Sequence, residues 1–217
     1  MNKYNNISSP VIKRLPRYYR FLGELMEKGI TKISSRELSD KMGFTASQIR
    51  QDLNCFGEFG QQGYGYSVES LYNEIGHILG LDNCYNAILI GAGNLGKAVA
   101  MHMSFEKRGF RLIGIFDNDK EKVGTNIKGL CVSDLDDLDK FCFETKTDVA
   151  ILCLPKTAAP EIADKLYSLG IRYYWNFSHY DLSIDHDDII VENVHLNDSL
   201  MILCYRISAE KEKNKDI

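Results

Sequence analysis

The sequence predicts an α/β protein in two parts, in which a small helical module precedes a doubly wound parallel sheet and a C-terminal helix. Two observations lead to this prediction. The first eighty residues contain short helices with capping residues, followed by a glycine-rich hairpin. From Asn86 onward apolar strands alternate with amphipathic helices, and the first strand runs directly into Gly91-Ala92-Gly93-Asn94-Leu95-Gly96.

The composition is that of an ordinary soluble globular protein. The chain has 217 residues, of which 44% are hydrophobic and 26% charged. No apolar run approaches the roughly 20 residues that a membrane helix needs, and the first ten residues lack an apolar signal region. The six cysteines include no Cys-x-x-Cys pair, which favours reduced thiols over a disulfide frame or a zinc site. We therefore expect a cytoplasmic protein with no membrane partner.

Charge is distributed unevenly along the chain. Residues 1–60 carry ten Lys or Arg and six Asp or Glu, a balance of +4, whereas the whole chain carries −4 and the remainder therefore −8. A basic module that meets phosphates, joined to an acidic module that does not, would show this asymmetry.

The first eighty residues predict a helix-turn-helix. Apolar residues Ile12, Leu15, Tyr19, Leu22 and Met26 recur at helical spacing, and Gly29 ends this helix. Ser34-x-x-Glu37 and Thr45-x-x-Gln48 are capping boxes that start helices at 36–42 and 46–55. Ser67 caps a fourth helix that ends at Gly80. Two short capped helices joined by a glycine-containing turn are typical of a DNA-binding helix-turn-helix.

The second of these capped helices is the candidate DNA reader. Ile49, Leu53 and Phe56 share one side and are expected to pack inward, which leaves polar side chains on the other side that can bond base edges and phosphates. The hairpin at 59–66 has the composition of a wing, and the module is therefore predicted to be a winged helix. Candidate DNA contacts are Arg14, Arg17, Thr45, Ser47, Gln48, Arg50, Gln51, Gln62 and Tyr66.

A Rossmann-like sheet follows the short linker at 81–85. Strands are expected at 86–91, 110–116, 147–154, 171–177 and 189–194, with helices at 94–108, 134–144 and 158–169. We expect three segments: the winged helix at 1–82, the Rossmann domain at 83–195, and a C-terminal helix with a charged tail at 196–217. The apolar stripe of that helix could cap its own domain or pack on a partner.

The glycine loop predicts a pyrophosphate site. Gly91 permits the tight turn, Gly93 lets the backbone approach the phosphates, and Gly96 allows the helix to pack closely on the strand. The helix N-terminus at Asn94 adds unpaired N–H groups. Asp117, about twenty residues later at the end of the second strand, would accept hydrogen bonds from a ribose and repel a 2′-phosphate, which favours NAD(H).

The residues give little support to an enzyme. The sequence has no Ser-His-Asp order, no metal-ligand cluster at recognised spacing and no separate substrate domain. An oxidoreductase would need an acid or base at the nicotinamide. We therefore expect a binding protein with no catalytic residues.

The chain resembles the Rex family of bacterial redox-sensing repressors over nearly its whole length. The resemblance rests on specific stretches of sequence: Arg14 to Arg20, Thr45 to Leu53, Phe56 to Gly60, Gly63 to Tyr66, Gly91 to Gly96, Asn176-Phe177 and Val191 to Val194. It implies a homodimer that binds a pseudo-palindromic operator, with NADH releasing the DNA. It also implies that Asn176 and Phe177 belong to the cofactor site and that the C-terminal helix swaps into the partner subunit.

The resemblance departs at the nicotinamide end. The family usually has Tyr, Pro and Asp where this chain has His102, His179 and His195. Arg20 matches the family arginine that pairs with that Asp in the partner, and a protonated His195 would repel it. Discrimination between NADH and NAD⁺ is then weakened or lost, or the three histidines converge on a metal.

Two other readings stay open. The Rossmann module could bind another ligand, such as an adenine nucleotide or coenzyme A, or could serve only as a dimer scaffold.

The wing pair Gln61-Gln62 lacks basic residues, which predicts few phosphate contacts there.

Overall fold

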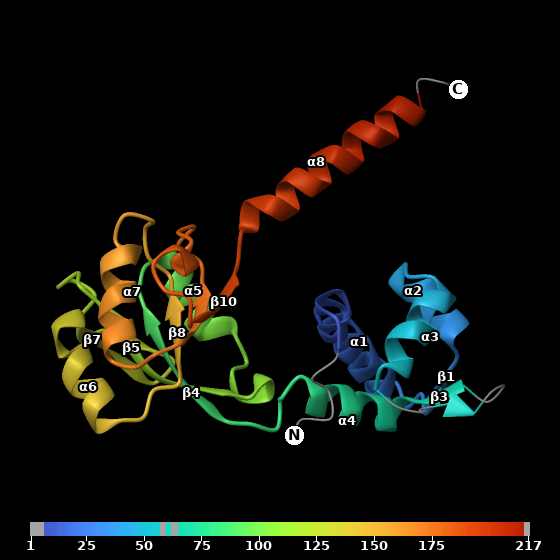
Figure 1. The fold of residues 1–217 in the computed structure, drawn as a ribbon, viewed down its shortest axis with the longest axis horizontal. Coiled ribbons are helices and arrows are strands. Elements are labelled where there is room, and N and C mark those ends of the chain that lie inside the picture. The colour runs from blue at the N-terminus through green and yellow to red at the C-terminus, as the bar shows by residue number, and fades with distance from the viewer. Residues whose placement is uncertain (1–6, 57–59, 62–64, 215–217) are drawn as a thin grey trace. The chain divides into compact units, whose positions relative to one another are not determined.

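The computed structural model describes residues 7–56, 60–61 and 65–214. Its contacts divide the chain into two compact units, Met1–Asn83 and Cys84–Ile217. The ribbon in Figure 1 shows the elements of each unit.

The first unit is a helical module with a small sheet. Its helices are α1 (Ser9–Glu27), α2 (Ser35–Met42), α3 (Ala46–Asn54) and α4 (Val68–Ile78), and its strands are β1 (Lys32–Ile33), β2 (Gly60–Gln61) and β3 (Gly65–Ser67). The strands are antiparallel in the order β1-β3-β2. The predicted hairpin is confirmed as β2–β3, although its tip, with Gln62, lies outside the described residues. The two-residue strand β1 was not predicted.

The buried face of α1 is rotated from the predicted one, since Leu15 and Leu22 are buried as predicted and Tyr19 is half-buried. Ile12 and Met26 are exposed, whereas Val11, Leu15, Tyr18, Leu22 and Leu25 are buried. Both sets recur at helical spacing, so periodicity alone does not separate them. The face that carries Tyr18 is the buried one because the Tyr18 hydroxyl donates a hydrogen bond to the buried carboxylate of Asp52 on α3. The predicted inward face of α3, with Ile49, Leu53 and Phe56, is confirmed.

Capping residues start three of the helices as predicted. Ser34 and Glu37 form a complete capping box at α2. Ser67 accepts from the N–H of Ser70 at α4. Thr45 accepts from the N–H of Gln48 at α3, but the reciprocal half of the predicted box does not form. The Gln48 side chain instead donates to Asp52.

The second unit is a doubly wound sheet, as predicted. Its strands are β4 (Tyr85–Ile90), β5 (Phe110–Asp117), β6 (Asn126–Ile127), β7 (Leu130–Asp134), β8 (Val149–Leu152), β9 (Tyr173–Asn176) and β10 (Ile190–Asn193). They lie in the order β10-β9-β8-β4-β5-β7-β6, all parallel except the antiparallel pair β6–β7.

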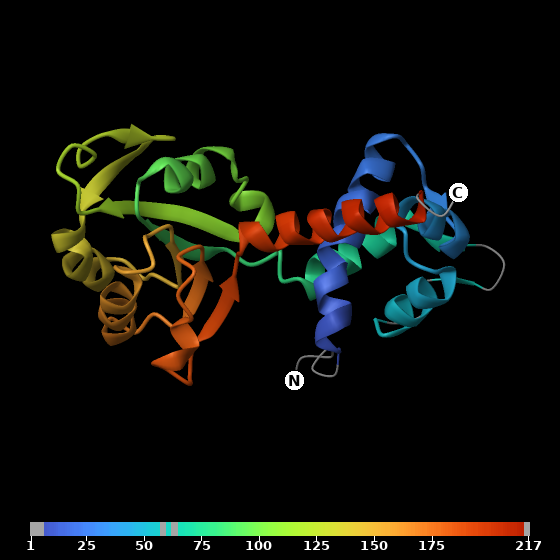
Figure 2. The same ribbon diagram turned by 90° about the horizontal axis from the view of Figure 1, so that it is seen from above.

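Helices cover the two faces of this sheet unequally. Helix α5 (Asn94–His102) packs on one face, and α6 (Leu138–Glu144) and α7 (Ala159–Ser168) pack on the other. Figure 2 shows the green helix α5 and the yellow and orange helices α6 and α7 on opposite sides of the sheet.

Three predictions for the second unit need correction. Helix α5 stops at His102 instead of residue 108, because buried Phe105 draws the chain inward and Gly109 turns it left-handed into β5. The hairpin β6–β7 was not predicted. Helix α8 (Leu196–Lys213) extends into the charged tail, since the Glu- and Lys-rich segment is made of good helix formers.

Candidate functional site

The glycine loop joins the end of β4 to the start of α5. Gly91 has φ +98°, and a Cβ there would lie 2.4 Å from the carbonyl oxygen of Cys153. A Cβ on Gly96 would lie 1.8 Å from the carbonyl oxygen of Gly91, so close packing of the helix requires glycine. A Cβ on Gly93, in contrast, would meet no atom within 4 Å. The space beside Gly93 is therefore open to a ligand.

The start of α5 is suited to an anion. Gly93 is its N-cap and supplies no side-chain hydrogen bond, so the first N–H groups of the helix, from Asn94 and Leu95 onward, have no side-chain cap. Such a helix end, with its partial positive charge, favours phosphate oxygens. The open space and the free donors fit the pyrophosphate of a dinucleotide.

Asp117 lies at the end of β5 beside this loop and is 6% exposed. Its Oδ2 accepts from the backbone N–H of Ala92 at 2.6 Å, and its Oδ1 accepts from the N–H of Asp119 at 2.8 Å. Lys122 Nζ lies 3.4 Å from the same Oδ2. Asp117 therefore already fixes the loop, while its Oδ1, which accepts a single hydrogen bond, keeps a lone pair for a ribose hydroxyl.

A cavity of about 550 Å³ extends from the loop across the carboxyl ends of the strands. Its volume is in the range of small-molecule sites. Gly91, Gly93, Asn94, Leu95 and Asp117 line it. Sequence reasoning missed several further lining residues, namely Asn118, Lys122, Leu135, Cys153, Leu154, Pro155, Ala158, Glu161 and Ile162. The available signal was their place in the segments that follow β5, β7 and β8, since ligands of open α/β sheets bind beyond the carboxyl ends of the strands.

Asn176 and Phe177 have structural roles at the end of β9. Asn176 is 1% exposed; its amide donates to the carbonyl of Tyr180 and to Asn193 Oδ1, and its oxygen accepts twice from Ser178. In this arrangement the side chain uses its whole hydrogen-bonding capacity within the protein. Phe177 is buried edge-on against Trp175.

Of the three unexpected histidines, only two meet. His179 follows β9, His195 precedes α8, and their Nδ1 atoms are 3.1 Å apart. His102 is the exposed last residue of α5. Within the described part of the chain, no three His, Cys, Asp or Glu side chains are grouped to hold a metal ion. The hypothesis that all three histidines converge on one metal is therefore wrong for the single chain.

Helix α3 presents a polar surface in the first unit. Ser47, Arg50 and Gln51 are exposed, as is Thr45 at its N-cap. Arg50 Nη1 donates to Ser35 Oγ at 3.2 Å, which links α3 to α2. These side chains are available to a ligand that lies along the helix.

Two predicted DNA contacts are engaged inside the unit instead. Arg14 donates to both carboxylate oxygens of Asp52, each at 2.7 Å, and Gln48 Nε2 donates to Oδ1 at 2.9 Å. Arg14 is thereby tied to a carboxylate that is fully buried. Burial alone would raise the pKa of Asp52, but the hydrogen bonds from Arg14, Gln48 and Tyr18 lower it below its ordinary value.

The remaining predicted residues of this unit lie at or near its surface. Arg17 is exposed, with its guanidinium 4.8 Å from the centre of the Phe44 ring. Arg20 is exposed on α1. Tyr66 on β3 is half-buried, and burial raises the pKa of its hydroxyl.

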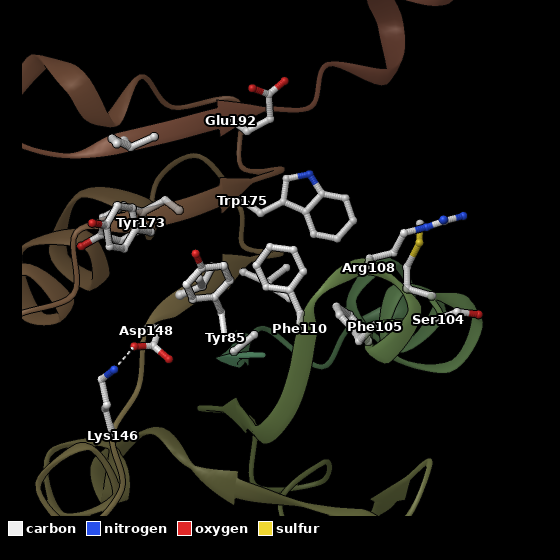
Figure 3. A pocket seen from close by; sticks show the side chains of 16 residues that line it. Tyr85, Ser104, Phe105, Arg108, Phe110, Lys146, Asp148, Tyr173, Trp175 and Glu192 are labelled. Atoms are coloured by element: carbon white, nitrogen blue, oxygen red, sulfur yellow. Dashed lines mark ion pairs between the residues drawn. The ribbon is translucent and has the colours of Figure 1, made fainter. Parts of the chain in front are cut away.

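A second, larger cavity of about 940 Å³ lies at the amino ends of the strands, on the α5 face of the sheet. Its lining includes six aromatic residues, and Figure 3 shows the rings of Tyr85, Phe110 and Trp175 turned toward the same space. The short α5 leaves this part of the sheet without a covering helix. The unit thus exposes a broad apolar groove.

Helix α8 is the other exposed apolar surface of this unit. None of its residues is buried, and Leu200, Met201, Leu203 and Tyr205 are each more than half exposed. Among the described residues, no helix is long and apolar enough to cross a membrane. Apolar exposure on this scale marks a protein-protein contact.

The chain matches known families in both units. A family model described as the N-terminus of a putative DNA-binding protein matches residues 6–54, and one described as a CoA binding domain matches residues 82–180. Solved structures of RSP, a Rex-family repressor, superpose with a TM-score of 0.86 at 52% identity, covering 96% of this chain and 97% of that one. RSP in complex with β-NADH gives 0.87 at 50% identity, covering 98% and 100%.

Curated relatives agree with the structural match. The redox-sensing transcriptional repressor Rex of Thermoanaerobacter pseudethanolicus is 54% identical over 211 residues, which cover 97% of this chain and 94% of the relative. Rex of Clostridium perfringens (strain SM101) is 52% identical over 208 residues, which cover 96% and 98%. With this identity over nearly its full length, the chain belongs to the Rex family of redox-sensing transcriptional repressors.

Proposed function

We propose that this protein is a DNA-binding repressor that senses the ratio of NADH to NAD⁺, and that NADH releases it from operator DNA. The observation that carries the proposal is the open space at Gly93 beside the uncapped start of α5, in a chain that also carries a polar helix-turn-helix. RSP, about half identical, has been solved with β-NADH and with β-NAD⁺ and operator DNA. The nucleotide is then a signal and not a substrate.

The nucleotide site is built from few groups. The backbone around Gly93 and Asn94 would hold the pyrophosphate, and Asp117 would accept from the adenosine ribose. Lys122 bridges Asp117 and Asp119, at 3.4 Å and 3.1 Å, and so holds the first carboxylate in place. Bound NAD(H) would supply the redox-dependent charge of its nicotinamide ring.

DNA would be read by α3. Ser47, Arg50 and Gln51 are the exposed side chains that can reach base edges, whereas Thr45 and Arg17 would contact phosphates. Gln48 would act through its orientation toward Asp52. Since operator DNA is the partner, the protein would work in the cytoplasm.

The protein would act as a homodimer on a pseudo-palindromic site. Helix α8, from Leu196 on, has no buried residue, and the aromatic groove on the α5 face has no covering helix. Each feature needs an apolar partner, and α8 of a second copy in that groove would cover both. This exchange would make 196–217 a dimerisation segment.

Titration of labelled operator DNA with the protein, with and without NADH, tests the proposal. Because coupling is reciprocal, NADH must weaken DNA binding by the same factor by which DNA weakens NADH binding. DNA affinity that ignores NADH at saturation would refute it.

A second candidate is a repressor with weakened discrimination or another ligand. His179 and His195 contact each other and not an acidic side chain, and the match to a CoA binding model favours comparison with coenzyme A. Calorimetric affinities for NADH, NAD⁺ and coenzyme A decide between the candidates.

A further inference from the structure

The pair formed by His179 and His195 differs chemically from the other paired histidines of the chain. His77 contacts Asp82 and His186 contacts Asp164, so each has a carboxylate partner. His179 and His195 contact each other, with no other hydrogen-bond or ion-pair partner among the described residues. Both are exposed. Two nitrogens that meet without an acid between them form an arrangement that a cation can bridge.

The geometry of the pair fits a metal ion. The two ring centres are 5.2 Å apart and the planes differ by 20°, whereas the two Nδ1 atoms are 3.1 Å apart. The nitrogens therefore lie on the facing edges of the rings. An ion bound to two imidazoles at about 2.0–2.1 Å would hold the nitrogens about 3.3 Å apart at a tetrahedral angle and about 2.9 Å apart at a right angle. The observed separation lies between these values.

The backbone also holds His179 in an unusual conformation. Its φ is +59°, in the left-handed region that few residues other than glycine adopt. The turn that keeps it there is fixed by the buried amide of Asn176, which bonds Ser178 and the carbonyl of Tyr180. His195 is the N-cap of α8. The two ligands thus come from two segments that are each fixed by local structure.

We propose that His179 and His195 form a two-imidazole site for a borderline transition-metal dication such as Ni²⁺ or Zn²⁺, with water in the remaining coordination positions. Imidazole is a favoured ligand of these ions, and hard ions such as Mg²⁺ prefer oxygen. A bound ion would join the turn after β9 to the N-cap of α8. The proposal does not depend on the nucleotide or DNA activity.

The test is a calorimetric titration of the untagged full-length protein with NiCl₂, with MgCl₂ as the negative control. One Ni²⁺ per chain is expected. His179→Asn and His195→Asn should each weaken binding by about tenfold or more, because a chelating pair becomes a single ligand. Asparagine tolerates the left-handed backbone at position 179. His102→Asn is the matched control and should bind like the wild type.

A second measurement shows whether the variants are folded and whether the metal binds to the folded protein. Ni²⁺ should raise the Tm of the wild-type protein and of the His102 variant, but not that of either pair variant, while all four keep the same circular dichroism spectrum without metal. Absence of Ni²⁺ binding overturns the proposal. So does binding that survives both pair substitutions, or that falls equally in the His102 variant.

Discussion

The buried carboxylate of Asp52 should be the most sensitive point of the first unit. It is fully buried, and its two oxygens accept four hydrogen bonds, two from Arg14 and one each from Tyr18 and Gln48. Asp52→Asn keeps the volume but removes the charge and replaces one acceptor by a donor. One of the two oxygens that accept these hydrogen bonds is then lost, and the Arg14 guanidinium lies beside a neutral amide that cannot neutralise its charge.

The size of the effect can be worked from the exposure of the partners. Breaking a buried ion pair costs about 3–5 kcal/mol. The Arg14 side chain is 23% exposed and can turn partly to water, so we expect the lower end, about 3 kcal/mol of unfolding free energy. Tyr18→Phe removes one of the four bonds and leaves the ion pair intact, so it should cost about 1.5 kcal/mol.

Urea unfolding separates this effect from the rest of the protein. Circular dichroism follows the helices of both units, whereas fluorescence of Trp175, the single tryptophan of the chain, follows the second unit alone and serves as an internal control. A shift of the circular dichroism transition without a shift in fluorescence therefore belongs to the first unit. The Trp175 transition should not move in either variant. A loss below about 1 kcal/mol for Asp52→Asn, or one smaller than that for Tyr18→Phe, would refute the reasoning.

The same carboxylate predicts a pH dependence. The pKa of Asp52 in the folded protein lies below its ordinary value of 3.8, so its stabilising effect is present above that value. It is lost as the pH falls through the lower, folded pKa. The first unit should therefore lose stability below about pH 4, and the Asp52→Asn variant should show a smaller loss. Acid titrations of the wild type and the variant, followed by circular dichroism, check this prediction. Equal loss of stability with falling pH in the two proteins would contradict it.

Three further predictions concern the proposed sites. Arg17→Ala should lower the slope of DNA affinity against salt by about 1, with an unchanged Tm, if this exposed side chain contacts a phosphate; an unchanged slope speaks against the contact. Gly93→Ala should leave the stability of the second unit intact because its Cβ enters open space, and it should weaken NADH binding at least about tenfold because that space would hold the phosphates. Gly96→Ala should instead destabilise the unit through its clash with Gly91. Equal NADH affinity in the wild type and the Gly93 variant would contradict the phosphate assignment. Burial raises the pKa of Cys153 to about 12, so iodoacetamide at pH 8 should label this thiol far more slowly than the exposed ones, as mass spectrometry would show.

Local patterns predicted most elements correctly because their causes are local. The capping box at Ser34 and Glu37 is formed by residues three apart, and the alternation of apolar strands with helices reflects burial on both faces of a parallel sheet. The strand β6 could not be found this way, because two residues give no readable period.

The nucleotide site also combines residues that local patterns predicted with residues that they did not. The spacing of Gly91, Gly93 and Gly96 was readable because it answers the backbone requirements of one loop. Asp117 was readable from its position at the end of the second strand. The cavity residues after β8, such as Cys153 and Glu161, and the engagement of Asn176 in its own turn depend on which segments meet at the end of the sheet.

The sequence by itself determined the type of each unit, the phosphate loop and the polar face of α3, because periodicity, capping and glycine spacing act over a few residues. Only the tertiary structure decided which face of α1 is buried, that Arg14 pairs with Asp52 instead of facing outward, and that two histidines out of three meet. In each of these cases several arrangements satisfy the local rules equally well. The choice depends on partners that are distant in sequence, and for a buried carboxylate the free energy of leaving it unpaired is large enough to decide.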